Sequence, residues 1–425
     1  MDYRRRVVDD TLDEMFPHLA AIALEGAKGV GKSATAGERA ATVVNLADPR
    51  RRAAVELDWD YVTTVRPPVL VDEWQLYPPV WDRVKKAVDE DSSGGRYLLA
   101  GSANVAPGTR IHSGAGRIIS LRMRPLSVAE RGLIDPTVSF AELLAGGRPT
   151  VRGQSSVTPG DYVDEILASG FPGIRELPAR LRAQQLDGYL ARIVERELPE
   201  NGVEVRRPAA LRRWLAAYGA ATSSTATYTT ILDAATPGES DKISRATADS
   251  YRNHLERIFV VDPVEAWIPV FNPLKKLGSS PKHHLVDPAL AARIAGVDRA
   301  GLLSGDGHVL AGGAATWLGA LFESLVTQSV RVYADAAFAR VGHLRTRDSN
   351  YPREVDLVVE GDDRRVVGIE VKLAPVVTDR DVRHLLWLRD QLGDRVADLV
   401  VVTTGDIAYR RADGIAVVPL ALLGP

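Results

Sequence analysis

Short apolar runs alternate with helix-like stretches through the first 140 residues of the chain. The runs lie at Ala20–Leu24, Thr42–Leu46, Val69–Val71 and Tyr97–Ala100, and each ends at a polar or glycine-containing turn. Strands that alternate with helices are typical of βαβ units, whose parallel sheet is buried on both faces. The pattern therefore predicts an α/β domain built on a parallel sheet.

The pattern changes beyond this region. Residues 146–161 are rich in Gly, Pro and Ser, which predicts a linker. Apolar residues at three- and four-residue spacing predict helices across Tyr162–Leu198, Ala209–Ala221 and Trp317–Tyr333. From about residue 265 the pattern is that of an α+β domain. Its predicted strands are Glu354–Glu360, Val366–Leu373 and Ala397–Thr403.

Composition excludes several classes of protein. The 425 residues are 45% hydrophobic and 25% charged, which is typical of a globular protein. The absence of cysteine excludes disulfides, thiolate nucleophiles and Cys-ligated zinc. No apolar stretch approaches the length of a membrane span, and the charged N-terminus lacks the apolar segment of a secretory signal. We therefore expect a soluble cytoplasmic protein that does not enter a membrane.

One motif predicts phosphate binding. Residues 26–33, GAKGVGKS, fit G-x-x-x-x-G-K-[ST], follow an apolar strand and open a helical stretch. Glycines let successive backbone N–H groups point at phosphates, and the start of the helix adds partial positive charge. Lys32 would neutralise the β- and γ-phosphates of ATP, and the Ser33 hydroxyl would ligate Mg²⁺. The predicted nucleotide-binding residues are Gly26, Gly29, Val30, Gly31, Lys32, Ser33 and Ala34.

Two further strand ends could complete an ATPase site. Asp72 and Glu73 end an apolar strand, beside the phosphate loop if the sheet is parallel. Asp72 would hold Mg²⁺ and Glu73 would polarise the attacking water, although acidic residues also end strands simply because they are solvated there. Ser102 would contact the γ-phosphate or the water, or would only make a turn. Arg117 is a candidate arginine finger supplied to a neighbouring subunit, which implies a homo-oligomer.

The C-terminal strands carry a second set of charged residues. Glu370 and Lys372 lie two apart in one strand and therefore share a face, while Asp356 lies in the preceding strand. The two carboxylates would bind Mg²⁺, the lysine would orient or deprotonate a water, and Glu323 would complete the metal ligands. A salt-bridged hairpin without catalytic activity would have the same pattern.

Residues 207–262 resemble a small helix-turn-helix unit. Ser244 is a good N-cap for the helix that follows it. The apolar side of this helix would comprise Ala248, Tyr251, Leu255 and Phe259. Its outward side would present Arg245, Asp249, Arg252 and Asn253, of which the arginines and the asparagine could meet phosphates and base edges of DNA. The alternative is a helical packing module between two larger domains.

These motifs together resemble a family of prokaryotic AAA+-type ATPases whose C-terminal domain of unknown function is related to the PD-(D/E)xK nucleases. The resemblance covers most of the chain, but residues 27–30, AKGV, replace an Arg-Gln pair expected within the phosphate loop. The motifs are Gly26–Ser33, Asp72–Gln75 with Pro78, Gly101-Ser102, Gly116-Arg117, Pro125–Glu130, Phe171-Pro172, Pro281–Asp287, Phe322-Glu323, Glu354–Asp356 and Ile369–Lys372.

We therefore expect a P-loop ATPase domain at residues 1–140, a helical extension at 141–200, a winged-helix-like module at 201–265 and a nuclease-like α+β domain at 266–425. The expected function is Mg²⁺-dependent ATP binding and hydrolysis, with ATP and ADP as ligands, coupled to DNA through the C-terminal half. The alternative is a nucleotide-switched protein-interaction module whose nuclease-like domain is inert.

Overall fold

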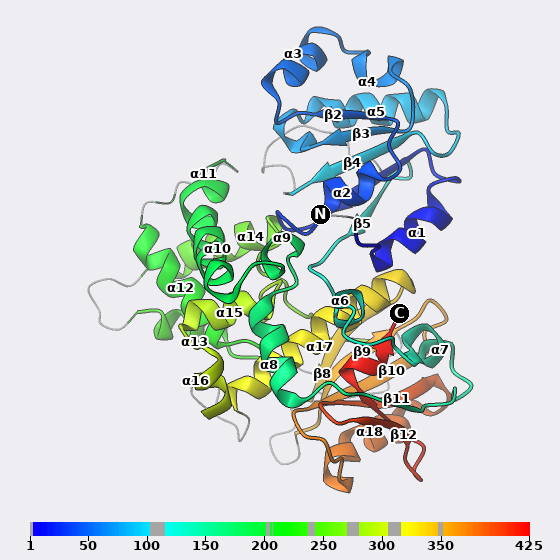
Figure 1. Cartoon of the computed structure of the whole chain (residues 1–425), viewed down its shortest axis with the longest axis vertical. Helices are drawn as coiled ribbons and strands as arrows, with labels where there is room; N and C mark the ends of the chain where they lie inside the picture. The colour runs from blue at the N-terminus through cyan, green and yellow to red at the C-terminus, as the bar shows by residue number, and fades with distance from the viewer. Residues whose placement is uncertain are drawn as a thin grey trace.

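The computed structural model (Figure 1) describes residues 3–102, 115–200, 205, 207–236, 243–269, 280–304, 316–346 and 352–425. An α/β region lies at one end of the molecule, a second sheet lies at the other end, and a group of helices lies beside them. The long helix α17 (Trp317–Ala336) runs through the middle, and thirteen of its twenty residues are buried.

Five parallel strands form the N-terminal sheet in the order β2-β3-β4-β1-β5, which confirms the predicted parallel sheet. The side chains of β1 alternate between two cores, with Ala21 and Ala23 on one face and Ile22 and Leu24 on the other. The strands are β1 (Ala21–Glu25), β2 (Thr42–Asn45), β3 (Val69–Asp72), β4 (Tyr97–Gly101) and β5 (Ile118–Arg122). The helices are α1 (Val7–Met15), α2 (Lys32–Gly37), α3 (Pro49–Leu57), α4 (Tyr61–Thr64) and α5 (Pro79–Glu90).

Helices dominate the middle of the chain. The helical pattern predicted across Tyr162–Leu198 is confirmed, but it is divided into several helices, because Ser169 adopts a left-handed φ of 69° and Pro172 and Pro178 stand at the starts of new helices. A short π-helix, Ile193–Glu197, also interrupts the α-helical hydrogen bonding. The helices are α8 (Pro159–Ala168), α9 (Pro172–Arg175), α10 (Ala179–Arg192), α11 (Leu198–Glu200), α12 (Pro208–Ala220), α13 (Tyr228–Ala234), α14 (Arg245–Arg257), α15 (Pro288–Ala295) and α16 (Arg299–Ser304).

The predicted DNA-binding module differs from its expected form. Within the described part of residues 207–262, no two strands pair as a wing, and Val261 makes only an isolated bridge to Leu285. Residues 237–242 lie outside the described residues. Arg245 is exposed as predicted, but the Arg252 guanidinium lies over the Tyr228 ring, 4.2 Å from its centroid. The outward cationic face of α14 is therefore smaller than the sequence predicts.

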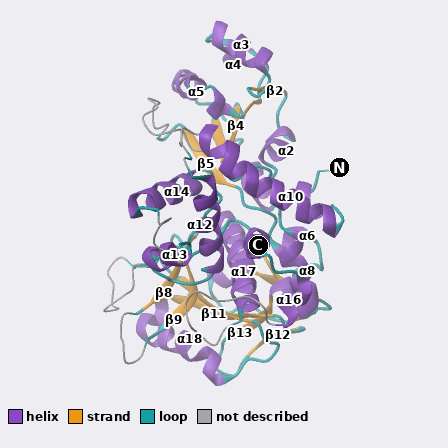
Figure 2. Cartoon of the chain, turned by 90° about the vertical axis from the view of Figure 1, so that its left-hand side faces the viewer, coloured by secondary structure: helices purple, strands orange, loops and turns teal. Residues whose placement is uncertain are grey.

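A mixed seven-stranded sheet forms the C-terminal part in the order β7-β12-β13-β11-β10-β9-β8. Helix α18 (Asp379–Leu392) covers one face, and α17 with α7 (Phe140–Ala145) packs against the other. Figure 2 shows this sheet at the opposite end of the molecule from β2 and β4. The strands are β7 (Gly153–Gln154), β8 (Arg340–Arg345), β9 (Glu354–Glu360), β10 (Val366–Lys372), β11 (Val396–Thr403), β12 (Ile407–Arg410) and β13 (Ala416–Pro419).

The end of the chain returns to the segment that follows β5. Strand β14 (Leu423–Gly424) pairs with β6 (Val138–Ser139), and the short helix α6 (Val128–Arg131) precedes this pair. The Tyr162 hydroxyl accepts a hydrogen bond from the backbone N–H of Ala421. Within the described ranges, none of the helices is long and apolar enough to cross a membrane.

Candidate functional site

The predicted phosphate loop joins the end of β1 to the start of α2. Gly26 has a φ of 154°, and a Cβ atom there would lie 2.1 Å from the carbonyl oxygen of Met123. Gly31 is the N-cap of α2 and has a φ of 105°, a conformation that side chains rarely adopt. The backbone therefore requires glycine at both positions, which accounts for the spacing of the motif.

Lys32 is the first residue of α2, directly after this loop, and only 7% of its surface is exposed. Its ammonium donates hydrogen bonds to the carbonyl oxygens of Gly26 and Ala27, at 2.8 and 2.9 Å. Burial lowers the pKa of Lys32 to about 8, and the negative charges of Glu73 and Asp72 offset only part of that shift. The lysine is thus held by the loop's own carbonyl groups.

Ser33 and Asp72 lie side by side although 39 residues separate them. The Ser33 hydroxyl donates a 2.7 Å hydrogen bond to Oδ1 of Asp72, which ends β3 and is 7% exposed. Strand β4 lies between β1 and β3, so the carboxyl ends of the three strands meet at one edge of the sheet. A hydroxyl and a carboxylate are the oxygen ligands that Mg²⁺ prefers, so the pair fits that ion chemically.

Glu73 belongs to a small polar cluster beside this pair. It adopts a left-handed φ of 53°, which is uncommon for a residue with a side chain and occurs often at functional sites. The Gln75 amide donates to Oε2 of Glu73 at 2.5 Å and to the Ser102 hydroxyl at 3.2 Å. The Ser102 hydroxyl in turn lies 3.4 Å from Oε2 of Glu73. Gln75 is a site residue that sequence reasoning missed, although it stands in the quoted motif Asp72–Gln75.

Residues of the helical region pack directly on the phosphate loop. The Lys28 ammonium forms a 2.8 Å ion pair with Glu197 of the π-helix. A Cβ atom at Gly29 would lie 3.8 Å from the Phe171 ring, so the loop and the start of α9 are close neighbours. The helical region is therefore positioned to respond to changes in the loop.

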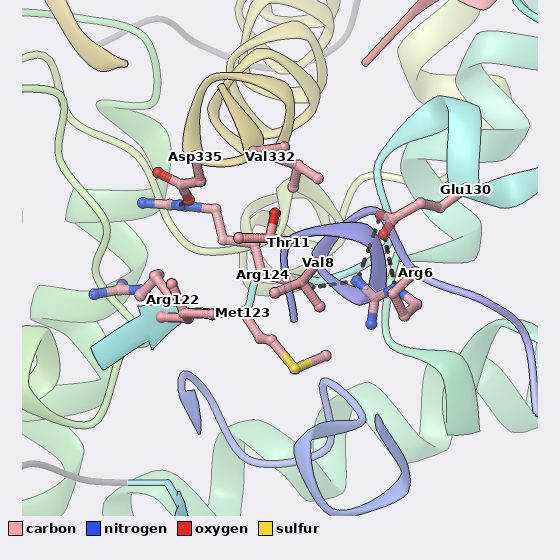
Figure 3. A pocket seen from close by; sticks show the side chains of 11 residues that line it. Arg6, Val8, Thr11, Arg122, Met123, Arg124, Glu130, Val332 and Asp335 are labelled. Atoms are coloured by element: carbon pink, nitrogen blue, oxygen red, sulfur yellow. Dashed lines mark hydrogen bonds and ion pairs between the residues drawn. The ribbon is translucent and has the colours of Figure 1, made fainter. Parts of the chain in front are cut away.

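A buried arginine joins the loop to the segment that follows β5. Arg6 donates to the Val30 carbonyl at 2.8 Å and to the Arg124 carbonyl at 2.9 Å, and it pairs with Glu130 at 2.9 Å. Arg6, Arg124 and Glu130 line a pocket between α1, β5 and α17, in which Arg6 faces Glu130 and Arg124 lies beside Asp335 (Figure 3). The ion pairs Arg6–Glu130 and Arg124–Asp335 therefore lie at this pocket, between the phosphate loop and α17.

Arg117 lies far from the loop of its own chain. It precedes β5, whose register with β1 sets Ile118 against Ala21, at the opposite edge of the sheet from the phosphate loop. Its guanidinium pairs with Asp89 at 2.8 Å, and its side chain is 47% exposed. The structure therefore does not bring Arg117 to the phosphate loop of its own chain, and its role as an arginine finger stays a prediction.

The C-terminal strands bring the second predicted set together around a lysine. The Lys282 ammonium lies 2.8 Å from Oε1 of Glu323, 3.0 Å from Oδ1 of Asp356 and 3.4 Å from Oε1 of Glu354. Lys372 forms a 2.9 Å ion pair with Glu370. Sequence reasoning missed Lys282 as a site residue, although lysine is scarce enough in this chain to be a signal.

The charges in this carboxylate centre, which we define as Glu323, Glu354, Asp356 and Glu370, influence one another strongly. Burial would lower the pKa of Lys282, but the charges of Asp356, Glu323 and Glu354 outweigh it and raise the pKa well above its ordinary value. Burial raises the pKa of Glu323 to about 8, and burial together with the charge of Asp356 raises that of Glu370 to about 8. Among the residues with described positions, no three His, Asp or Glu side chains are arranged to hold a metal ion.

Three family models match the chain in succession. Residues 19–131 match an AAA domain, residues 160–301 match a domain of unknown function (DUF8612), and residues 318–423 match a domain of unknown function (DUF4143). The matched ranges are separated by residues 132–159 and 302–317, whereas the predicted borders lie at 140, 200 and 265. The descriptions of the second and third domains name no activity.

Two relatives are each 25% identical to this chain over 355 residues, which are 83% of this chain and 68% of the relative. They are the uncharacterized protein Rv2008c of Mycobacterium tuberculosis and the uncharacterized protein Mb2031c of Mycobacterium bovis. The alignment with the crystal structure of protein VC1899 from Vibrio cholerae covers 94% of each chain at 11% identity, but the TM-score of 0.22 is too low to indicate a shared fold. The match that bears on function is the N-terminal one, which supports an ATPase domain of the AAA type.

Proposed function

We propose that this protein binds ATP with Mg²⁺ and hydrolyses it at the carboxyl ends of β1, β3 and β4. The observation that carries the proposal is the meeting of Lys32, the Ser33–Asp72 pair and the Glu73–Gln75–Ser102 cluster at that edge. The AAA match over residues 19–131 supports the same function. Each group has a distinct task in phosphoryl transfer, which depends mainly on positioning and charge.

The loop and its lysine would bind the phosphates. The N–H groups of Gly26–Ala34 provide donors, and the Lys32 ammonium would exchange its contacts with the Gly26 and Ala27 carbonyls for phosphate oxygens. Ser33 and Asp72 would hold Mg²⁺, which supplies positive charge to the phosphate oxygens when it is bound. A nucleotide therefore gives the buried Lys32 a partner of opposite charge.

Glu73 would orient and polarise the attacking water. Its carboxylate already accepts a hydrogen bond from Gln75, and Ser102 lies within 3.4 Å. Gln75 is thus a positioning residue that keeps the carboxylate pointed at the sheet edge, while Ser102 would contact the water or the γ-phosphate. In an oligomer, Arg117 of a neighbouring copy would stabilise the charge of the transition state.

Hydrolysis would act as a switch, because the helical region packs on the loop. Loss of the γ-phosphate would change the loop contacts of Lys28 and Phe171 and so move the helices that follow them. Coupling to DNA stays a prediction, and the smaller cationic face of α14 does not add support to it. A nucleotide-switched protein-interaction module requires no such face.

Equilibrium binding of Mg²⁺-ATP by fluorescence anisotropy tests the proposal. We expect Lys32→Ala to abolish binding, because the phosphates lose their cationic partner. Lys85→Ala is the matched control, since Lys85 lies on α5 and pairs with Asp89 away from the loop. Unchanged ATP affinity in a folded Lys32→Ala protein would refute the proposed site.

A further inference from the structure

The carboxylate centre already contains a cation that belongs to the protein. The Lys282 ammonium is 1% exposed and lies within 3.4 Å of oxygens from Glu323, Glu354 and Asp356. These residues come from α17 and β9, while Lys282 comes from the segment that precedes α15. Three elements distant in sequence therefore converge on a single ammonium group.

The backbone holds this lysine in place. The Lys282 N–H donates to the Val264 carbonyl at 2.8 Å, and the Val264 N–H donates back to the Lys282 carbonyl at 2.9 Å. The next residue, His283, donates from its backbone N–H to the Ser224 carbonyl at 2.9 Å. The backbone of Lys282 is thus fixed, and its ammonium cannot leave the centre without breaking its ion pairs with Glu323, Glu354 and Asp356.

Several of the oxygens that a metal ion would need already have partners. Oδ1 of Asp356 accepts from Lys282, and Oδ2 of Asp356 accepts a 2.9 Å hydrogen bond from the Val371 N–H. Oε1 of Glu370 accepts from Lys372, whereas Oε2 of Glu370 is buried and has no hydrogen-bond partner. Mg²⁺ and Mn²⁺ bind several oxygens at once, and a metal ion here would have to displace the partners of both Asp356 oxygens and of Oε1 of Glu323 and Glu370.

Charge leads to the same conclusion. A divalent ion placed on Asp356 and Glu370 would stand close to the Lys282 ammonium, and like charges repel strongly in a buried site of low dielectric. An ammonium group, by contrast, neutralises carboxylates without requiring the fixed coordination geometry of a metal ion. The lysine thus satisfies the electrostatic need that a metal ion would otherwise meet.

We propose that the Lys282 ammonium permanently occupies the cation position of the carboxylate centre, so that the C-terminal domain binds no divalent metal ion. The predicted metal role of Glu323, Asp356 and Glu370 is thereby replaced by a structural one. Metal-dependent phosphodiester cleavage, which the pattern of Asp356, Glu370 and Lys372 suggests, does not occur at this centre. Lys282, Glu323 and Asp356 instead form an ionic core within the domain.

Titration of the full-length chain with Mn²⁺, followed by the electron paramagnetic resonance signal of free Mn²⁺, tests this proposal. All variants carry Asp72→Asn and are measured without nucleotide, so that the phosphate loop contributes no metal site. With Lys282 present we expect no bound Mn²⁺. Lys282→Ala should bind one Mn²⁺ per chain, and adding Asp356→Asn to it should remove that site.

Lys372→Ala is the matched control, because it removes a lysine from the same centre but leaves the Lys282 ammonium in place. We expect it to gain no site. A folded Lys282→Ala protein that binds no more Mn²⁺ than its parent would overturn the proposal. If Lys282→Ala does not fold, the Asp72→Asn chain that retains Lys282 still tests the proposal. Mn²⁺ binding by this chain that is lost on adding Asp356→Asn would contradict the proposal, and no Mn²⁺ binding with or without Asp356→Asn supports it.

Discussion

The ion pairs around Asp262 connect the N-terminal sheet to α17, and we expect their loss to be costly. The Asp262 carboxylate lies 3.1 Å from Arg122, 2.9 Å from Arg124 and 3.1 Å from Arg331. Asp262 is 9% exposed at its side chain and Arg124 is 6% exposed. One carboxylate thus pairs with three guanidinium groups, and Asp262→Asn would leave these positive charges close together without that counter-charge.

The size of the effect follows from this burial. Removing one partner from a buried ion pair costs about 3–5 kcal/mol, because the other charge remains buried without compensation. Asp335→Asn is a matched control, since Asp335 also pairs with Arg124 but is 41% exposed. Exposed pairs contribute only about 0–1 kcal/mol, so this variant should be almost as stable as the parent.

The expected cost does not depend on pH near neutrality. The charges of Arg124, Arg331 and Arg122 outweigh burial and hold the pKa of Asp262 far below its ordinary value. A carboxylate whose pKa is depressed on folding contributes stability above its unfolded pKa of about 3.9 and loses that contribution only as the pH falls toward the folded pKa. The stability difference should therefore be the same throughout the neutral range.

Urea unfolding monitored by tryptophan fluorescence measures this difference. We expect the midpoint of Asp262→Asn to fall well below that of the parent, with Asp335→Asn close to the parent at each neutral pH. If both substitutions shift the midpoint equally, or if Asp262→Asn has no effect, the reasoning from burial and charge is refuted.

Three further predictions concern the phosphate loop and its neighbours. Because the pKa of Lys32 is lowered to about 8, ATP affinity measured by calorimetry should fall by up to about tenfold per pH unit above that value, whereas Lys32→Arg should show no such fall. Gly26→Ala should abolish ATP binding, because its Cβ would meet the Met123 carbonyl at 2.1 Å, while Gly37→Ala, with no atom within 4 Å, should bind normally. Gln75→Ala should lower kcat by about 10- to 100-fold with little change in KM, as steady-state assays would show; an unchanged kcat would remove its positioning role.

Much of the fold could be predicted because the N-terminal strands are short apolar runs with clear ends. The predicted Val69–Val71 and Tyr97–Ala100 each differ from the observed strands by one residue. The helical middle was less predictable, because apolar spacing continues through the break at Ser169–Pro172 and the π-helix. The local spacing of apolar residues does not indicate where a chain must bend to pack on another domain.

The sequence predicts the residues of the candidate ATPase site that have a direct chemical role, but not those that only hold them in place. The sequence predicts that Ser33 and Asp72 share a site, because Asp72 ends one parallel strand and Ser33 belongs to the loop that follows another; the Ser33 hydroxyl lies 2.7 Å from Oδ1 of Asp72. Gln75 was missed because its role depends on how the turn after β3 folds. Lys282 was missed for a stronger reason: it reaches the carboxylate centre from a segment without a regular strand, so no spacing links it to Asp356.

The measurement that tests the central claim most directly is steady-state Mg²⁺-dependent ATP hydrolysis by the wild-type protein and by Glu73→Gln, with ATP affinity measured in parallel. We predict that the wild type hydrolyses ATP, and that Glu73→Gln binds it with similar affinity but turns it over at least about 100-fold more slowly. Turnover by Glu73→Gln at the wild-type rate would contradict the assigned role of the strand-end carboxylate, and so would a wild-type protein that binds ATP without hydrolysing it.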